Sequence, residues 1–169
     1  MTIEIRRLGH DAVEAVCSFI EDVASRLPDR VLYAGDDANY LHALISHRGE
    51  MYGAFMNERL VAYSAIIFPG IGENNLGASF GVPQHELLRV ASLDGTVVHE
   101  SARGNGLQRK FHEHREQVAR QYGCLHLYST VHPENKASLR NLEACGFTYQ
   151  FSRTMYGGLP RDCYAKKLQ

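Results

Sequence analysis

The chain lacks tryptophan, a long apolar run and any close pair of cysteines. No stretch approaches the roughly 20 apolar residues of a membrane helix, and the N-terminal residues MTIEIRRLGHD contain no apolar signal core. The 4 cysteines are scattered without a CxxC motif, so we expect neither a disulfide framework nor a metal site. These absences predict a soluble, cytoplasmic protein that does not associate with membranes.

A large excess of one charge is also missing, because 18 Lys and Arg balance 19 Asp and Glu. Such a balance argues against binding to nucleic acid through bulk electrostatics, and we expect no nucleic-acid partner. The charges are nevertheless unevenly distributed. Residues 1–58 carry ten acids and five bases, whereas residues 103–120 carry five bases and two acids. Solvated helix faces explain most such charges, and the alternative is one acidic surface and one surface that faces phosphate.

The 169 residues are enough for one domain with a continuous core, and no linker or repeat divides residues 1–169. Patterns of β-forming residues predict strands at residues 2–8, 51–55, 60–68, 90–99, 124–131, 147–151 and 162–167. Apolar stripes predict a helix capped by Asp11, a second capped by Asp36 or Asp37, a third after residue 106 and a fourth over 136–144. A glycine-rich loop, residues 69–83, separates two of the strands. The order indicates an α/β (α+β) domain with a mixed sheet.

The most informative segment is VVHESARGNGLQRKF, in which a strand leads through two glycines into a helix. Glycines let backbone N–H groups approach an anion closely, and the first turn of a helix has unpaired N–H groups. The segment therefore predicts a phosphate or pyrophosphate site, unless the glycines serve only a tight strand-to-helix turn. A P-loop would need Lys and Ser or Thr after Gly106, where Leu107 and Gln108 stand, and a dinucleotide fingerprint would need a third glycine.

The run RGNGLQ resembles the Q/R-x-x-G-x-G/A loop of the GNAT superfamily of acyl-CoA-dependent N-acyltransferases, with Arg103, Gly106 and Gln108 at its first, fourth and sixth positions. Downstream, VHPENKASLRNLEACGF resembles the second signature of that superfamily, a strand, an Asn, a short helix and a closing Gly-Phe. The resemblance covers nearly the whole chain. It implies a mixed, mostly antiparallel central sheet of about seven strands, splayed in the middle, with helices on both faces.

The resemblance further implies an enzyme, a monomer or homodimer, that moves an acetyl group from acetyl-CoA directly to a primary amine of a small molecule or peptide. Pantetheine would pair with the backbone of Val97, Val98 and His99. The Val98 N–H would polarise the thioester carbonyl as an oxyanion donor. The pyrophosphate would lie on the backbone N–H groups of the loop: Arg103, Gly104, Asn105, Gly106, Leu107 and Gln108. Further contacts to the cofactor would come from Asn135, Ser138 and Asn141.

The catalytic groups are less sharply defined. Many members of the superfamily have a Tyr four residues before the closing Gly to protonate the leaving thiolate, and here that position is Leu142. Ser138, Asn141, Tyr128 or a water molecule are the alternatives. For the base that takes the amine proton, Asp94 comes first. Strand alternation puts it on the face of Val98 and opposite His99. Glu100 comes second, and the alternative for Asp94-Gly95 is a turn or bulge.

The acceptor site of such folds is usually formed by the first two helices, their connection and the loop between the third and fourth strands, here residues 26–40 and 69–86. Three acids in the first segment favour a cationic amine: Asp29, Asp36 and Asp37. Candidate lining residues are Tyr33, Tyr40, Asn75 and Phe80. Two other functions stay open, a toxin-like acetyltransferase of aminoacyl-tRNA and a non-catalytic acyl-CoA-binding domain. Leu142 favours the second of these.

Overall fold

The computed structural model describes residues 2–27, 37–72, 74–155 and 157–168. They contain one seven-stranded mixed sheet in the order β1-β2-β3-β4-β5-β7-β6, in which only β4 and β5 pair in parallel. This confirms the mixed, mostly antiparallel sheet. The strands are β1 (Ile3–Leu8), β2 (Gly49–Met56), β3 (Arg59–Ile67), β4 (Val90–Val98), β5 (His126–Val131), β6 (Thr148–Met155) and β7 (Leu159–Lys167).

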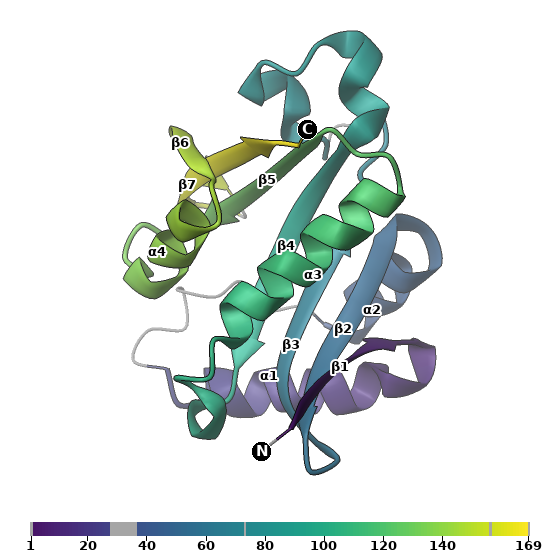
Figure 1. Ribbon diagram of the computed structural model, residues 1–169, viewed down its shortest axis with the longest axis vertical. Helices are drawn as coiled ribbons and strands as arrows, with labels where there is room; N and C mark the ends of the chain where they lie inside the picture. Colours follow the sequence, from purple (N-terminus) through teal and green to yellow (C-terminus); the bar gives the residue numbers. More distant parts are fainter. Residues whose placement is uncertain (1, 28–36, 73, 156, 169) are drawn as a thin grey trace.

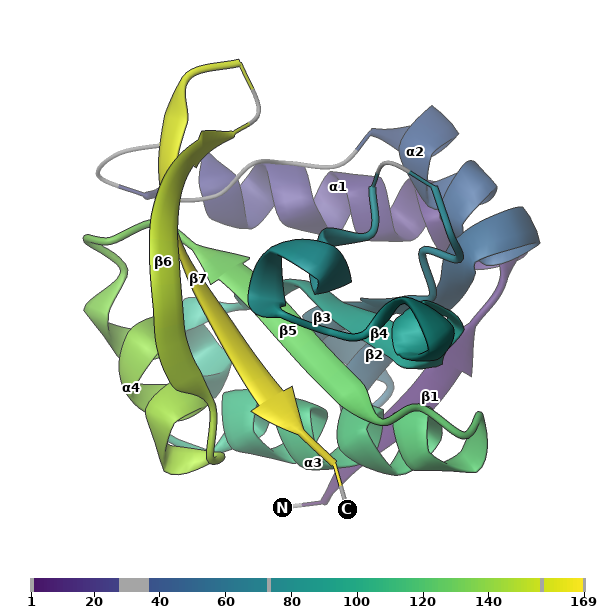
Figure 2. The same ribbon diagram turned by 90° about the horizontal axis from the view of Figure 1, so that it is seen from above.

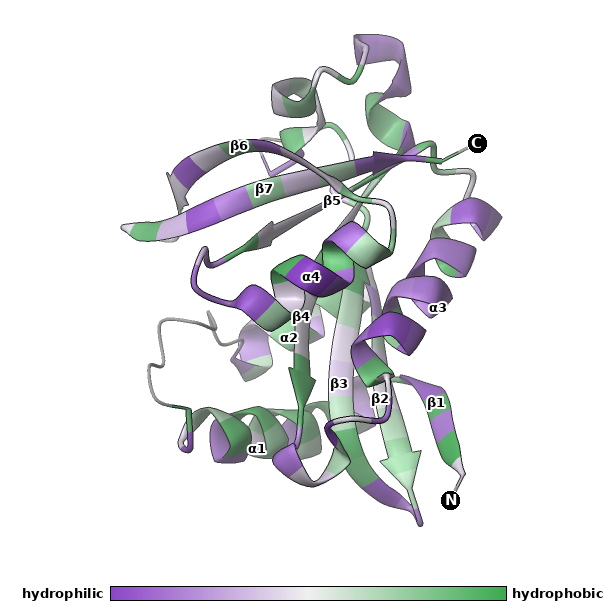
Figure 3. Cartoon of the chain, turned by 60° about the vertical axis from the view of Figure 1, so that its left-hand side comes forward, coloured by the Kyte–Doolittle hydropathy of each residue, from purple (hydrophilic) through white to green (hydrophobic). Residues whose placement is uncertain are grey.

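Helices cover both faces of the sheet, as Figure 2 shows from above. One face carries α1 (Val13–Ala24) and α2 (Ala38–Ala43), and the other carries α3 (Leu107–Gln121) and α4 (Lys136–Ala144). Two apolar clusters fill the space on the two sides of the strands. Figure 3 shows that α1 is mostly hydrophobic whereas α3 is mostly hydrophilic. The buried face of α3 accordingly includes the polar residues His112 and Arg115. No helix among the described residues is both long and apolar enough to span a membrane.

The sheet opens between its two parallel strands. β4 and β5 are paired only from Val90 to Ser92, opposite His126 to Tyr128. Beyond these residues the two strands diverge, which is visible at the centre of Figure 1. The splayed sheet is therefore confirmed, and the last part of β4 presents an edge that β5 does not cover.

A bulge interrupts β4 next to this opening. Thr96 lies opposite Ser64 whereas Asp94 lies opposite Ala65, so Gly95 is the extra residue of the ladder. The shift places Asp94 on the face of Val97. The prediction that Asp94 shares a face with Val98 and opposes His99 is therefore wrong. Side chains alternate between the two faces of a regular strand, but the inserted Gly95 interrupts that alternation between Asp94 and Val98.

A buried arginine on α3 donates hydrogen bonds to backbone carbonyls beside the bulge. Arg115, on α3, is 1% exposed, and its Nη1 donates to the carbonyl oxygens of Ala65 at 3.0 Å and Asp94 at 2.7 Å. Burial lowers the pKa of Arg115 to about 10, and the neighbouring Asp94 opposes that shift. Arg115 belongs to the basic segment 103–120, so this segment is not a uniform phosphate-facing surface.

The predicted helix caps have mixed outcomes. Asp37 caps α2, since its Oδ1 accepts the N–H of Tyr40 at 2.8 Å. Asp11 does not cap α1. A 3-10 turn at His10–Ala12 precedes this helix, and Ala12 is its N-cap residue. The predicted glycine-rich loop, residues 69–83, contains one short 3-10 segment at Leu76–Phe80, and a second at Gln84–Arg89 follows it.

Candidate active site

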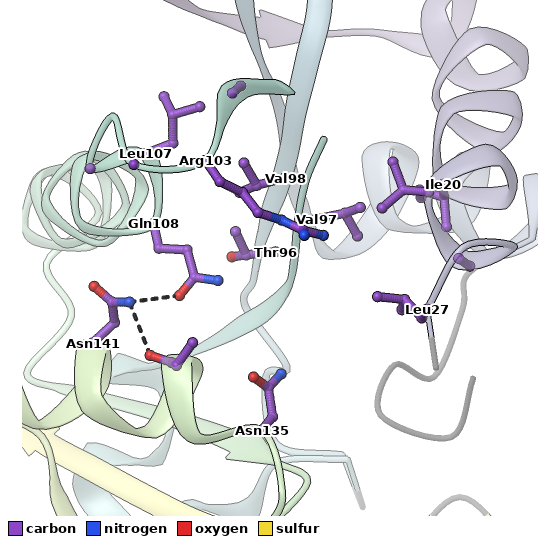
Figure 4. Close-up of a pocket in the computed structure, with 16 residues that line it drawn as sticks. Ile20, Leu27, Thr96, Val97, Val98, Arg103, Leu107, Gln108, Asn135 and Asn141 are labelled. Atoms are coloured by element: carbon purple, nitrogen blue, oxygen red, sulfur yellow. Dashed lines mark hydrogen bonds between the residues drawn. The ribbon is translucent and has the colours of Figure 1, made fainter. Parts of the chain in front are cut away.

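A cavity of about 500 Å³ opens where β4 ends, between α1, the loop at 102–106 and α4 (Figure 4). It brings together most of the residues predicted to bind the cofactor: Val97, Val98, Arg103, Gly104, Gly106, Leu107, Gln108, Asn135 and Asn141. The wall opposite the loop is apolar and comes from the last turns of α1 and the residues after it. Sequence patterning assigned these apolar residues only to the core: Ile20, Val23, Ala24 and Leu27.

The loop at residues 102–106 and the first turn of α3, together called the cradle, have a backbone geometry that suits the binding of an anion. Gly104 and Gly106 have φ angles of 81° and 69°, and a Cβ on either would meet no atom within 4 Å. The first backbone bond of α3 runs from the Lys110 N–H to the Gly106 carbonyl at 3.0 Å. The N–H groups of the preceding helical residues are therefore left for a ligand. A phosphorylated cofactor with a long, partly apolar arm fits this cradle and the apolar wall of α1.

Two amide side chains lie at the cradle's edge. Gln108 departs from the superfamily's Gly or Ala, and its side chain turns toward α4, where its Oε1 accepts from Asn141 Nδ2 at 2.9 Å (Figure 4). Asn141 Nδ2 also donates to the Ala137 carbonyl at 3.0 Å. Asn135 caps α4, because its Oδ1 accepts the Ser138 N–H at 3.3 Å. Gln108 and Asn141 thus join the start of α3 to α4.

Three predicted cofactor residues do not line the cavity. The Asn105 side chain donates to the carbonyls of Ala102 and Arg103. His99 Nδ1 accepts the N–H of Ser101 at 3.0 Å, and its ring packs near Phe19. Ser138 lies on α4 without facing the cavity. The side chains of Asn105 and His99 thus stabilise the turn that leads into the cradle.

Backbone direction distinguishes the three residues predicted to pair with pantetheine. The His99 N–H donates to the Val61 carbonyl at 2.9 Å, so His99 directs its backbone toward β3. Backbone groups alternate along a strand. Val98 therefore directs its N–H toward the open edge, whereas Val97 and His99 direct theirs toward β3. Backbone pairing of pantetheine at Val97 and at His99 is a prediction that this geometry corrects.

A second cavity, of about 460 Å³, lies on the other side of the bulge and contains Asp94. Asp94 Oδ2 accepts from the Tyr40 hydroxyl at 2.9 Å. Burial raises the pKa of Asp94, while the hydrogen bonds from Tyr40 and the Gly95 N–H and the charge of Arg115 partly oppose the rise. The structure thus separates Asp94 from the cavity of the cradle and places it in the wall of a second site.

The other candidate base, Glu100, begins the short 3-10 segment Glu100–Ala102 after β4 and does not line the cradle cavity. It forms an ion pair with Arg26, and this hydrogen bond holds the pKa of Glu100 below its usual range. Tyr128 donates its hydroxyl proton to the Asn74 carbonyl at 3.0 Å and lines the second cavity. Leu142 is 1% exposed and belongs to the core. The ion pair makes Glu100 a weaker base than a free carboxylate, and Leu142 has no proton to transfer.

The residues predicted around the acceptor are only partly brought together. Tyr40 lines the second cavity. Asn75 does not, because it caps a 3-10 segment and donates to the carbonyls of Gly70 and Leu87. Phe80 packs on Tyr128 and belongs to a different hollow. Arg26 lines neither cavity and pairs with Asp22 and Glu100. Three predicted residues fall outside the described part of the chain: Asp29, Tyr33 and Asp36.

A sheet opened between β4 and β5, with a glycine-bearing cradle at the opening, defines the class of acyltransferases that take their acyl group from coenzyme A. A sequence profile of the Acetyltransferase (GNAT) family matches residues 17–147. The chain therefore belongs to the GNAT acetyltransferase family, for which acetyl-CoA is the acyl donor. No protein with a curated description matches the chain in sequence.

Several solved structures share the fold. The protein yncA from Salmonella typhimurium, solved with its cofactor acetyl-CoA, is 15% identical with a TM-score of 0.74, covering 100% of this chain and 95% of its own. An N-acetyltransferase from Staphylococcus aureus is 14% identical with a TM-score of 0.74 and full coverage of both chains, 100% each. A ribosomal-protein-alanine N-acetyltransferase from Brucella melitensis is 18% identical with a TM-score of 0.73, and the match covers 98% of this chain and 99% of that protein's chain. At these identities the likeness establishes the fold alone.

Proposed function

We propose that the protein is an N-acetyltransferase that moves an acetyl group from acetyl-CoA directly to a primary amine of a small molecule or peptide. The observation that carries the proposal is the placement of the two cavities along one strand. The cradle cavity is lined by the end of β4, including Val98, and the second cavity by Ser92 and Asp94 of the same strand. A donor and an acceptor bound in these cavities would approach each other along β4.

Bound acetyl-CoA supplies an acyl group activated as a thioester. In the proposal the Val98 N–H, directed at the open edge, donates a hydrogen bond to the thioester carbonyl oxygen as the amine attacks. Such a donor contributes about 3 kcal/mol of transition-state stabilisation in other acyl-transfer enzymes. The cradle N–H groups and Arg103 hold the pyrophosphate, and Asn135 faces the same cavity from the start of α4.

Asp94 is the proposed acceptor of the amine proton. An alkylammonium has a pKa near about 10, so the amine must lose a proton before it attacks. Asp94 and Val98 lie opposite Ala65 and Ala62, three residues apart on β3, so roughly 10 Å of strand separates them. Asp94 is therefore too far from Val98 to touch an amine at the thioester directly. The proton therefore reaches Asp94 through water in the second cavity, and the raised pKa of Asp94 makes it a better base than an exposed carboxylate.

The leaving thiolate departs without a side-chain acid in this proposal. Ser138 does not face the cavity, and Asn141 contributes an amide, which donates hydrogen bonds but does not release a proton. A thiolate whose conjugate acid has a pKa near about 8.5 is a fair leaving group at neutral pH and takes its proton from solvent.

Thiol release from acetyl-CoA, measured against a panel of primary amines, tests the proposal. We expect release that depends on the amine and gives the N-acetylated product by mass spectrometry. If acetyl-CoA binds but no amine stimulates release, the catalytic function is refuted and a binding domain remains. Acetylation of aminoacyl-tRNA, with salt-dependent binding, would instead identify the tRNA-directed alternative.

Asp94→Asn tests the base separately. If Asp94 takes the proton, the variant loses more activity at pH 7 than at pH 9, where more of the amine is already neutral. Its affinity for acetyl-CoA, measured by calorimetry, should stay unchanged because Asp94 lies outside the cradle cavity. An equal loss of activity at both pH values would assign Asp94 a structural role in the bulge.

A further inference from the structure

The second cavity carries more positive than negative charge on its described walls. Its charged lining residues in the described part of the chain are Arg48, Arg153 and Asp94. Asp37, the one member of the predicted acidic wall that is described, does not line the cavity and accepts the N–H of Tyr40 at the start of α2. The expectation of an acidic acceptor site is therefore not met by these residues.

Arg48 and Arg153 reach the cavity from two different elements of the fold. Neither has a carboxylate partner among the described residues. Arg48 ends the π-helical segment Leu44–Arg48, and its side chain is exposed. Arg153 projects from β6, where its guanidinium lies 4.8 Å from the centre of the Phe151 ring and 3.4 Å from Ser79 Oγ. The aromatic contact fixes the direction of Arg153 without neutralising its charge.

Some exposed arginines of the chain do have carboxylate partners. Arg6 pairs with Glu4 at 2.9 Å and with Glu58 at 2.8 Å, and Arg26 pairs with Asp22 at 2.6 Å. Guanidinium groups bind carboxylates and phosphates through paired N–H donors. Two guanidiniums that have no such partner in the described part of the chain, on the walls of one cavity, leave that binding capacity available to a ligand.

We infer that the acceptor carries an anionic group, a carboxylate or a phosphate, in addition to the amine that is acetylated. The inference rests on the proposed function and specifies its substrate class. In this arrangement Arg48 and Arg153 bind the anionic end, and the amine points along β4 toward the thioester at Val98. The volume of about 460 Å³ lies within the range typical of small-molecule sites, which suits a free amino acid or an aminoalkyl phosphate. A polyamine fits less well because the arginines would repel its positive charges.

A matched series of acceptors tests the inference. The series comprises free amino acids, their primary amides, aminoalkyl phosphates and uncharged or diamine analogues of equal length, each assayed for kcat/KM with saturating acetyl-CoA. We expect the anionic acceptors to exceed their amides by about 10- to 100-fold, the range of a hydrogen bond to a charged group. The carboxylate and phosphate arms identify which anion is preferred.

The variants Arg48→Met and Arg153→Met should remove most of this discrimination, mainly through KM for the anionic acceptor. Arg59→Met is the matched control, because Arg59 is exposed and lines neither cavity. Binding of acetyl-CoA should be unchanged in all three variants. Equal kcat/KM for acids and amides, or discrimination that survives both substitutions, would overturn the inference while leaving the acetyltransferase intact. Absence of turnover with every amine would instead refute the proposed function.

Discussion

Replacement of Gly106 by Ala separates the strain of the cradle loop from its role in binding. Gly106 has a φ of 69°, a left-handed conformation that costs an L-residue about 1–2 kcal/mol. The added Cβ would meet no atom within 4 Å, so no steric clash adds to this cost. For a chain of 169 residues, a loss of this size lowers Tm by about 2–8 °C.

Gly123 offers the matched control, since it has a φ of 78° and the same open surroundings but follows the far end of α3. Gly106→Ala and Gly123→Ala should therefore lose similar stability. Only Gly106→Ala should weaken CoA binding. Its methyl group stands beside N–H groups that face the pyrophosphate, and one lost charge-assisted hydrogen bond corresponds to about 10- to 150-fold in Kd.

The two variants are compared by thermal unfolding and by calorimetric titration with CoA. Gly106→Trp extends the test, because an indole at this position fills the approach to the cradle and should abolish measurable binding. If Gly106→Ala and Gly106→Trp bind CoA as tightly as Gly123→Ala, the loop does not hold the pyrophosphate, and the glycines serve only the turn.

Three further predictions concern the bulge and its carboxylate. Tyr40→Phe removes a hydrogen bond that lowers the pKa of Asp94, so the acidic limb of the pH profile of kcat/KM should move to higher pH; a shift to lower pH contradicts the assignment. Because the pKa of Asp94 is higher in the folded than in the unfolded protein, its protonated form is stabilised by folding, and this contribution is lost as the pH rises through the folded-state pKa. Asp94→Asn should therefore raise the urea midpoint at pH 7 and leave it unchanged near pH 3. Arg115→Met leaves two buried carbonyls without a donor and should reduce the free energy of unfolding by about 2–5 kcal/mol, whereas Arg120→Met on the exposed face should cost under about 1 kcal/mol. Equal losses in the two arginine variants would show that Arg115 does not support the bulge.

The cradle was predictable from the sequence because its information is local. Two glycines between a strand and a helix dictate the backbone conformation of the loop, and the helix start supplies the unpaired N–H groups. The predicted strands and helices were found for a similar reason, since each has its own apolar periodicity. The apolar wall formed by the end of α1 was not predicted, because a residue that lines a cavity has the same pattern as one that fills a core.

The position of Asp94 could not be read from the sequence. Asp-Gly is compatible with a turn, a bulge or a regular strand, and one inserted residue reverses every side chain that precedes it. The bulge is decided by pairing with β3 and by Arg115, whose guanidinium reaches the Asp94 and Ala65 carbonyls from α3. Arg115 itself looked like an exposed base in a charged helix.

The glycine loop and the periodic elements by themselves determined a mixed-sheet domain with an anion cradle, and the resemblance of two motifs to the GNAT superfamily indicated the acyltransferase. Only the tertiary structure decided what surrounds the second cavity. Arg48 and Arg153 are more than a hundred residues apart in the chain, and each alone is an ordinary surface residue. Their charges act on one ligand because the fold brings the end of the π-helical segment before β2 and the strand β6 to the same hollow, although β2 and β6 are not neighbours in the sheet. The sum of charges along the chain does not contain that arrangement.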